Sequence, residues 1–191
     1  MLFAVVLIVI AFELVSLVYL YRASTDFIIA RREQRLPVYV PGDVVSWRGA
    51  SVGQLYGWAR ADAMGAFSIG PSATLAVRIS DRSPGDLELR VLADGLIDPQ
   101  TVRRREISVV INERPLARWS FDTAGPALQR VRIPETLVAP DGAVRVTFGI
   151  HEHRSPRALG RSPDPRAIGF RVIEWQILRL ERTTGDDVEP N

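Results

Sequence analysis

After Val38 the chain alternates between apolar and polar residues over a series of short stretches. Leu75, Val77 and Ile79 show the pattern clearly, because a small or charged residue separates each apolar residue from the next. Period-two alternation is typical of a β-strand that buries one face. Stretches of this kind occupy 73–79, 87–91, 107–111, 119–121, 131–133, 144–150 and 168–180. Helical periodicity is hard to find in this part of the chain, so the pattern predicts an all-β domain.

Turn-forming residues separate these stretches at the spacing expected of a β-sandwich. The clearest hairpin is 107–121, with its tip at 112–114. About eight strands without a soluble helix predict two packed antiparallel sheets, arranged as a jelly-roll-like sandwich. An immunoglobulin-type sandwich is the alternative, because periodicity alone does not separate the two.

The last strand carries a further signal. Its apolar residues fall at every second position from Ile168 to Val172 and then change phase through Trp175 and Ile177. A change of phase within one strand is typical of a β-bulge or of a bend between sheets. We therefore predict a bulge or a bend within the last strand.

The first 21 residues follow a different pattern, since they are almost all apolar. Their number is about what a helix needs to span a bilayer core. Tyr19 and Tyr21 fall where an interfacial aromatic belt would lie, and Arg22 follows them. We predict an uncleaved transmembrane helix at 1–22, a juxtamembrane helix or linker at 23–40, the sandwich at 41–182 and a disordered tail at 183–191.

Glu13 lies near the middle of the predicted transmembrane helix. A carboxylate at this depth costs about 2.5 kcal/mol or more and usually faces protein, water or a partner. We interpret Glu13 as a contact with a polytopic membrane partner. A protonated or snorkelling side chain in a tolerant single span is the alternative.

The side of the membrane on which the domain lies stays open. Arginines at 22, 31, 32 and 35 follow the apolar segment, and only the α-amine precedes it. By the positive-inside rule, this distribution favours a cytoplasmic domain.

Composition excludes several kinds of chemistry. The 191 residues include no cysteine, which excludes a disulfide framework, thiolate metal ligands and a cysteine nucleophile. Every basic residue is arginine, and the net charge is only +2. The arginines alternate with apolar residues or lie beside carboxylates, which disfavours nucleic-acid binding. We interpret the run from Arg103 to Arg105 as the end of a solvated loop before a strand.

Motifs of catalysis are missing from the sequence: it has no nucleophile elbow, no P-loop and no dinucleotide-binding fingerprint. The only histidines, His151 and His153, have the spacing of residues on one face of a strand. A metal site would need a third ligand such as Asp164, which the sequence does not define. We therefore predict no metal, no cofactor and no enzymatic activity, and retain both histidines as candidates for a ligand or partner surface.

Four tryptophans are candidates for sugar stacking or for the core. Trp119 and Trp175 lie on predicted strands, where large aromatic residues usually fill the core. Trp47 and Trp58 lie in glycine-rich connections, so they are the better candidates for a ligand or partner surface, with burial in the core as the alternative.

The segment before the last strand contains a short internal repeat. The sequence SPRALG at 155–160 returns as DPRAIG at 164–169, which predicts a doubled turn within one ordered loop. Asp164 is placed to accept backbone N–H bonds there, and Arg166 to pair with a carboxylate. We include both residues in the candidate ligand or partner surface.

This loop, within SPRALGRSPDPRAIGFRV, is also the most specific part of a resemblance. The order of Gly57-Trp58, the segment GAFSIG at 65–70, the strand ATLAV at 73–77 and the hairpin INERPLARWSF resemble the same domain. It is a β-sandwich accessory domain found in bacterial envelope glycosyltransferases and polysaccharide-assembly membrane proteins. The resemblance covers roughly residues 47–180. Two departures are the segment 59–62, where an aromatic-acidic stretch is expected, and Phe67, where tryptophan is usual.

The resemblance implies a non-catalytic module that works beside glycan synthesis. The predicted function is a membrane-anchored accessory subunit of a bacterial glycosyltransferase or polysaccharide assembly complex, in the inner membrane. Its expected partner is a polytopic glycosyltransferase or a related subunit, with glycan contacts in addition. The alternative is a stand-alone membrane-anchored carbohydrate-binding module. Envelope modules of this kind are also compatible with a periplasmic domain, in contrast to the arginine distribution.

Overall fold

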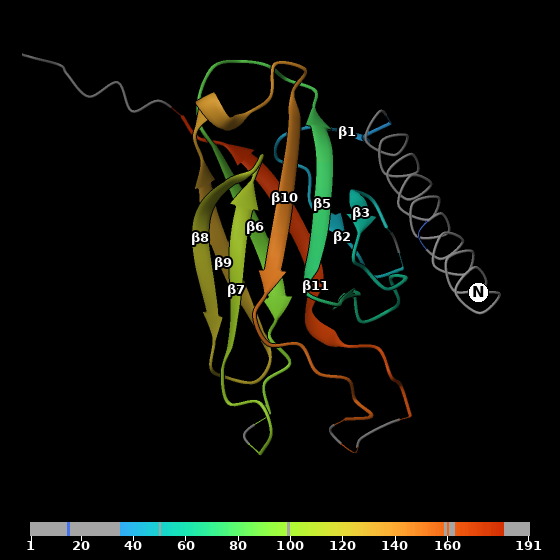
Figure 1. Ribbon diagram of the computed structural model, residues 1–191. Helices are drawn as coiled ribbons and strands as arrows, with labels where there is room; N and C mark the ends of the chain where they lie inside the picture. The colour runs from blue at the N-terminus through green and yellow to red at the C-terminus, as the bar shows by residue number, and fades with distance from the viewer. Residues whose placement is uncertain are drawn as a thin grey trace, which may run out of the picture. The chain divides into compact units, whose positions relative to one another are not determined.

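Figure 1 shows a computed structural model of the chain, which describes residue 15 and residues 35–49, 51–98, 100–158, 160 and 163–181. Apart from Val15, the predicted transmembrane helix lies outside these residues, as does Glu13. The predicted tail at 183–191 lies outside them as well. Within the described residues, no helix combines the length and apolar character needed to cross a membrane. The part from Leu36 onward forms a compact unit of its own.

Strands account for nearly all regular structure in this unit. The strands are β1 (Val38–Tyr39), β2 (Val45–Ser46), β3 (Gln54–Tyr56), β4 (Ala66–Ile69), β5 (Ser72–Ile79), β6 (Leu87–Asp94), β7 (Arg105–Ile111), β8 (Arg114–Phe121), β9 (Pro126–Ile133), β10 (Ala143–Ile150) and β11 (Ile168–Arg179). A single 3-10 turn, η1 (Glu135–Leu137), interrupts the connection from β9 to β10 within the described residues. All seven stretches predicted from alternation are strands, which confirms the all-β prediction.

The strands from β4 to β11 pair in a nested order. The innermost hairpin is β7–β8, around which β6 pairs with β9, β5 with β10 and β4 with β11. The result is two facing sheets, with orders β5-β10-β7-β8 and β4-β11-β6-β9. This is the strand order of a long hairpin rolled on itself, as in a jelly roll. The order therefore favours the jelly-roll-like sandwich over the immunoglobulin-type alternative.

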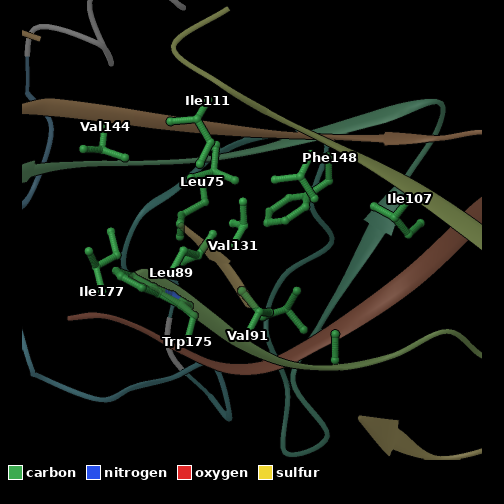
Figure 2. Close-up of a cluster of buried hydrophobic side chains, with 14 of the residues drawn as sticks. Leu75, Leu89, Val91, Ile107, Ile111, Val131, Val144, Phe148, Trp175 and Ile177 are labelled. Carbon is green, nitrogen blue, oxygen red and sulfur yellow. The ribbon is translucent and has the colours of Figure 1, made fainter. Parts of the chain in front are cut away.

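The core lies between the two sheets because alternate side chains of each strand point inward. In β7 the buried positions are Arg105, Ile107, Val109 and Ile111. Figure 2 shows Ile107 and Ile111 among side chains from both sheets, including Leu89 and Trp175. Trp119 and Trp175 are both buried, which confirms their prediction as core residues.

Two local features predicted from the sequence are present. The β7–β8 hairpin turns at Asn112 and Glu113, which both have positive φ, at 44° and 70°. Two left-handed residues in sequence give the tight hairpin turn that matches the twist of the strands. The last strand has a register shift between Val172 and Glu174 in its pairing with β6, so the predicted bulge is confirmed.

The three shortest strands, β1 to β3, are a part of the fold that alternation did not predict. β1 and β3 both pair with β5, and β2 pairs with β11. β1 lies within the range predicted as a helix or linker, 23–40, so the sheet begins earlier than predicted. The Tyr39 hydroxyl fixes this segment by accepting the backbone N–H of Ile177 at 2.8 Å. Strands of two or three residues are too short to show alternation, and long-range pairing determines them.

Candidate functional site

Two long loops leave the same end of the sandwich (Figure 1). One connects β6 to β7 over 95–104, and the other connects β10 to β11 over 151–167. Together with β4 they enclose a pocket of about 230 Å³. The pocket is lined by Phe67, Leu96, Asp98, Thr101, Val102, Arg105, Arg154, Pro156 and Ile168. An apolar wall with a few polar groups is the usual composition of a small-molecule site.

The loop after β6 is held in place by carboxylates. The Asp94 carboxylate accepts the backbone N–H of Leu96 at 2.8 Å and the Arg171 guanidinium at 2.7 Å. Leu96 has a φ of 55°, an unfavourable conformation for a bulky residue. Strained backbone of this kind persists where the surroundings fix it, and it is concentrated at ligand sites.

Further along the same loop, Asp98 closes a turn. Its carboxylate accepts the backbone N–H of Gln100 at 2.9 Å and the Thr101 hydroxyl at 3.2 Å. The backbone N–H of Val102 donates to the Asp98 carbonyl at 2.8 Å, and the Asp98 N–H donates in return to Val102. This side of the pocket is therefore preformed by its own hydrogen bonds.

The loop before β11 is ordered around Asp164 and Arg166. The Asp164 carboxylate accepts the backbone N–H of Arg166 at 3.0 Å and pairs with its guanidinium at 2.6 Å. These hydrogen bonds lower the pKa of Asp164 to about 2. The Asp164 carbonyl also accepts the backbone N–H of Arg157, and this hydrogen bond joins the two similar segments, 155–160 and 164–169. Both contacts predicted for this loop, the backbone bond to Asp164 and the carboxylate pair of Arg166, are present.

Asp164 and Arg166 nevertheless do not line the pocket. Their charged groups are directed at each other, so the structure gives them a role in shaping the loop. Their predicted place in a ligand or partner surface receives no support from this geometry.

Phe67 supplies the aromatic wall of the pocket. It lies on β4, opposite Arg171 of β11, and in this strand Ala66 and Ser68 are buried while Phe67 is partly exposed. The Arg171 guanidinium lies 5.7 Å from the centre of the Phe67 ring, close enough for a cation–π contact. The Asp94 pair holds the Arg171 guanidinium in this position over the Phe67 ring.

Arg105 is the unusual residue of the lining, because its side chain is 96% buried, with a relative exposure of 4%. Its Nε donates to the Gly95 carbonyl at 2.7 Å, and its Nη1 donates to the carbonyl of Glu152. Burial lowers the pKa of Arg105, with the charge of Glu152 acting in the opposite direction. The interpretation of Arg103–Arg105 as a solvated loop end is therefore wrong for Arg105, which begins β7 in phase with Ile107.

Trp47 and Trp58 were candidates for a ligand or partner surface. In the structure, Trp47 belongs to the hydrophobic core and Trp58 packs against that core. Trp47 is fully buried, and its indole Nε1 donates to the Val52 carbonyl. Trp58 is partly buried, donates to the Thr74 carbonyl at 2.8 Å and packs edge-on against Trp47 at 4.7 Å. The prediction of a surface role for Trp47 is wrong, because no part of its ring is exposed. Neither tryptophan lines the pocket.

His151 and His153 are both exposed and follow the end of β10 at Ile150. Because they lie beyond the strand, its alternation does not place them on one face. Among the described residues, no group of three His, Asp or Glu side chains is arranged to hold a metal ion. The histidines belong to the loop that carries Arg154 but do not line the pocket.

A second pocket, of about 200 Å³, lies at the opposite end of the sandwich, between the connections after β5 and β9. Arg179 reaches across it and donates to the carbonyls of Asp81 and Ser83. Glu135 accepts the backbone N–H of Gly85 at 2.8 Å. The charged groups of this second pocket thus connect the loops to each other, so it is the weaker candidate for a ligand site.

Comparison with known proteins gives no family assignment. The sequence matches no protein-family model, and no curated protein matches it. Among solved structures, one likeness is to the GH115 4-O-methyl-α-glucuronidase BtGH115A, with 8% identity and a TM-score of 0.43, over 73% of this chain and 16% of that chain. Another is to a CBM36 carbohydrate-binding module in complex with calcium and xylotriose, with 12% identity and a TM-score of 0.38, over 71% of this chain and 98% of that chain.

A third likeness is to the CBM36-1 domain of a xylanase from the hindgut metagenome of Trinervitermes trinervoides. It has 10% identity and a TM-score of 0.39, over 73% of this chain and 98% of that chain. These overlaps are loose, so the function of this chain is inferred from its own pocket.

Proposed function

We propose that the sandwich is a non-catalytic carbohydrate-binding domain and that it holds its ligand in the pocket beside Phe67. The observation that carries this proposal is the lining itself. It combines apolar side chains with Thr101, Asp98 and Arg154, which carry a hydroxyl, a carboxylate and a guanidinium group.

This composition suits a sugar ring. A pyranose has apolar C–H faces and hydroxyl groups around its edge, so it needs an apolar surface together with several hydrogen-bonding groups. Phe67 and Ile168 provide the apolar surface, and the polar lining residues provide the hydrogen-bonding groups. The volume of about 230 Å³ is below the roughly 300–1,000 Å³ of pockets for drug-sized ligands. It is therefore suited to one sugar residue or the end of a chain.

The geometry favours binding over hydrolysis. Glycosidases use two carboxyl groups about 5–10 Å apart on either side of the scissile bond. Among the described residues, the lining includes one carboxylate, Asp98, and hydrogen bonds within its own turn hold that carboxylate. A preformed site that only binds is consistent with the two ordered loops, because little ordering entropy remains to be lost on binding.

Binding to an array of neutral, acidic and amino-sugar oligosaccharides tests the proposal. The full chain should be kept in a detergent without a sugar headgroup, since a glycosidic detergent would compete. We expect at least one glycan class to bind and Phe67→Ala to weaken its binding about fivefold or more, because stacking contributes about 1 kcal/mol or more.

Leu128→Ala is the matched control, since Leu128 is 49% exposed on β9 and outside the pocket lining. It should leave binding unchanged. Absence of binding across the whole array would contradict the proposal, as would a ligand that Phe67→Ala binds as tightly as the wild type.

We further propose that this domain serves as an accessory subunit of a membrane glycosyltransferase or polysaccharide assembly complex. Support comes from the sequence: the apolar segment 1–21, with Glu13 in its middle, and the resemblance over residues 47–180. A lone carboxylate within an apolar segment is typical of a contact with a membrane partner.

Purification of the full chain from its own membranes in mild detergent tests this setting. A glycosyltransferase should co-purify with the wild type, be lost with Glu13→Leu and be retained with Glu13→Gln, which preserves a hydrogen-bonding group. If the wild type comes down alone, the accessory-subunit proposal is wrong, and glycan binding by the domain is unaffected.

A further inference from the structure

We propose that the ligand of this pocket is an acidic saccharide, whose anionic substituent binds between the guanidinium groups of Arg105 and Arg154. The inference rests on the proposed carbohydrate-binding function and specifies its ligand class.

The first step is the contrast between two arginines, of which Arg171 is partly buried and Arg105 is buried. The guanidinium of Arg171 pairs with the Asp94 carboxylate at 2.7 Å. The guanidinium of Arg105 is more deeply buried, yet its hydrogen bonds go to the uncharged carbonyls of Gly95 and Glu152. No ion pair among the described residues includes Arg105. A buried cation without a directly paired carboxylate is costly, and arginine stays protonated at all ordinary pH values.

The second step is the charge of the pocket as a whole. Arg105 and Arg154 both line it, whereas Asp98 is the one carboxylate among the lining side chains that the structure describes. Asp98 already accepts two hydrogen bonds within its turn. Glu152 lies next to Arg105 through its backbone carbonyl, and its exposed carboxylate acts on Arg105 only through its charge.

The third step is the match between donor and acceptor. Guanidinium groups present planar sets of N–H donors that fit carboxylate, sulfate and phosphate oxygens. The Arg105 Nε–H donates to the Gly95 carbonyl, and its Nη1 donates to the Glu152 carbonyl. These two hydrogen bonds fix the orientation of the guanidinium plane beside the cavity. An anion between Arg105 and Arg154 would pair directly with both guanidinium groups, whereas the Glu152 carboxylate acts on Arg105 only through its charge. Phe67 and Ile168 would contact the sugar ring.

Isothermal titration calorimetry of the full chain, again in a detergent without sugar, tests the inference with matched ligands. The probes are trigalacturonate, its fully methyl-esterified form and galactose 6-sulfate, with citrate as a free anion. We expect trigalacturonate to bind roughly tenfold to a hundredfold more tightly than its ester, because a hydrogen bond to a charged group is about this much stronger. The affinity for trigalacturonate should fall as salt is added. Binding of galactose 6-sulfate would also support the inference, with sulfate in place of carboxylate as the anionic group.

Arg105→Met should abolish the preference for acid over ester, because it keeps the length of the side chain and removes the charge. Arg104→Met is the control, since Arg104 is an exposed neighbour that pairs with Glu106 at 2.8 Å outside the pocket. Should Arg105→Met fail to fold, Arg154→Ala provides the test, because Arg154 is exposed. We expect it to weaken trigalacturonate about tenfold and to leave the ester unaffected.

The outcomes separate the two proposals. Equal affinity for trigalacturonate and its ester would overturn the acidic-ligand inference and leave carbohydrate binding standing. Citrate binding as tightly as trigalacturonate would also overturn it, since the site would then recognise an anion without a sugar. If none of these probes binds and the oligosaccharide array is negative as well, carbohydrate binding itself fails.

Discussion

Gly57→Ala should lower the free energy of unfolding of the sandwich by about 2–5 kcal/mol, the sum of a left-handed backbone cost and an overpacking cost. Gly57 has a φ of +75° and follows β3 directly. A Cβ atom there would lie 2.1 Å from the Ser72 carbonyl oxygen and 2.7 Å from the Ala73 Cα. Both are backbone atoms at the start of β5, so relief would require the strand to move.

Gly70→Ala is the matched control. Gly70 has almost the same backbone conformation, with a φ of +79°, and a Cβ atom there would meet nothing within 4 Å. It should cost only the conformational part, about 1–2 kcal/mol. Urea unfolding followed by tryptophan fluorescence gives both values. Equal effects of the two substitutions would contradict the close approach of Gly57 to β5.

Phe148→Ala should destabilise the domain by about 3–5 kcal/mol, the usual cost of a large aromatic side chain removed from a core. Phe148 is 1% exposed on β10 and lies between the two sheets, as Figure 2 shows. Its ring lies 5.3 Å from Phe170, 5.6 Å from Trp119 and 5.9 Å from Trp58. Its loss would leave a cavity among three rings that cannot close without moving the strands that carry them.

The control for this substitution is Leu128→Ala, which removes an exposed side chain from β9. It should change the free energy of unfolding by less than about 0.5 kcal/mol. Denaturant unfolding of both variants checks the prediction. A loss below about 1.5 kcal/mol for Phe148→Ala would show that these rings do not form the centre of the core.

Alternation in the sequence was sufficient to predict the long strands, because each of them buries one face. In β7 the residues Ile107, Val109 and Ile111 are all fully buried, as their spacing predicts. Local chemistry was likewise sufficient for the loop around Asp164, where the carboxylate bonds a residue two positions away. Predictions of this kind succeed because the determining contacts lie within a few residues.

The pocket could not be predicted in the same way, since its walls come from residues as far apart as Phe67, Arg105 and Ile168. Phe67 drew notice only as a departure from a pattern of tryptophan. Arg105 carried a signal that the run of three arginines concealed: it has the same parity as Ile107 and so points into the sandwich. Trp47 and Trp58 were placed by their glycine-rich neighbours, whereas the pairing of short edge strands determines their burial.

The measurement that tests the central claim most directly is a titration of the arginine Nε–H signals of the full chain by 15N–1H NMR. The Nε–H of Arg105 is buried and bonded to the Gly95 carbonyl, so it should exchange slowly and be observable, and Arg105→Met identifies its signal. With trigalacturonate as the probe, we expect a saturable shift of the Arg105 and Arg154 signals. The signal of Arg179, at the opposite end of the sandwich, should not shift. A saturable shift of Arg179, with Arg105 unchanged, would show that the sugar binds elsewhere and would contradict the account.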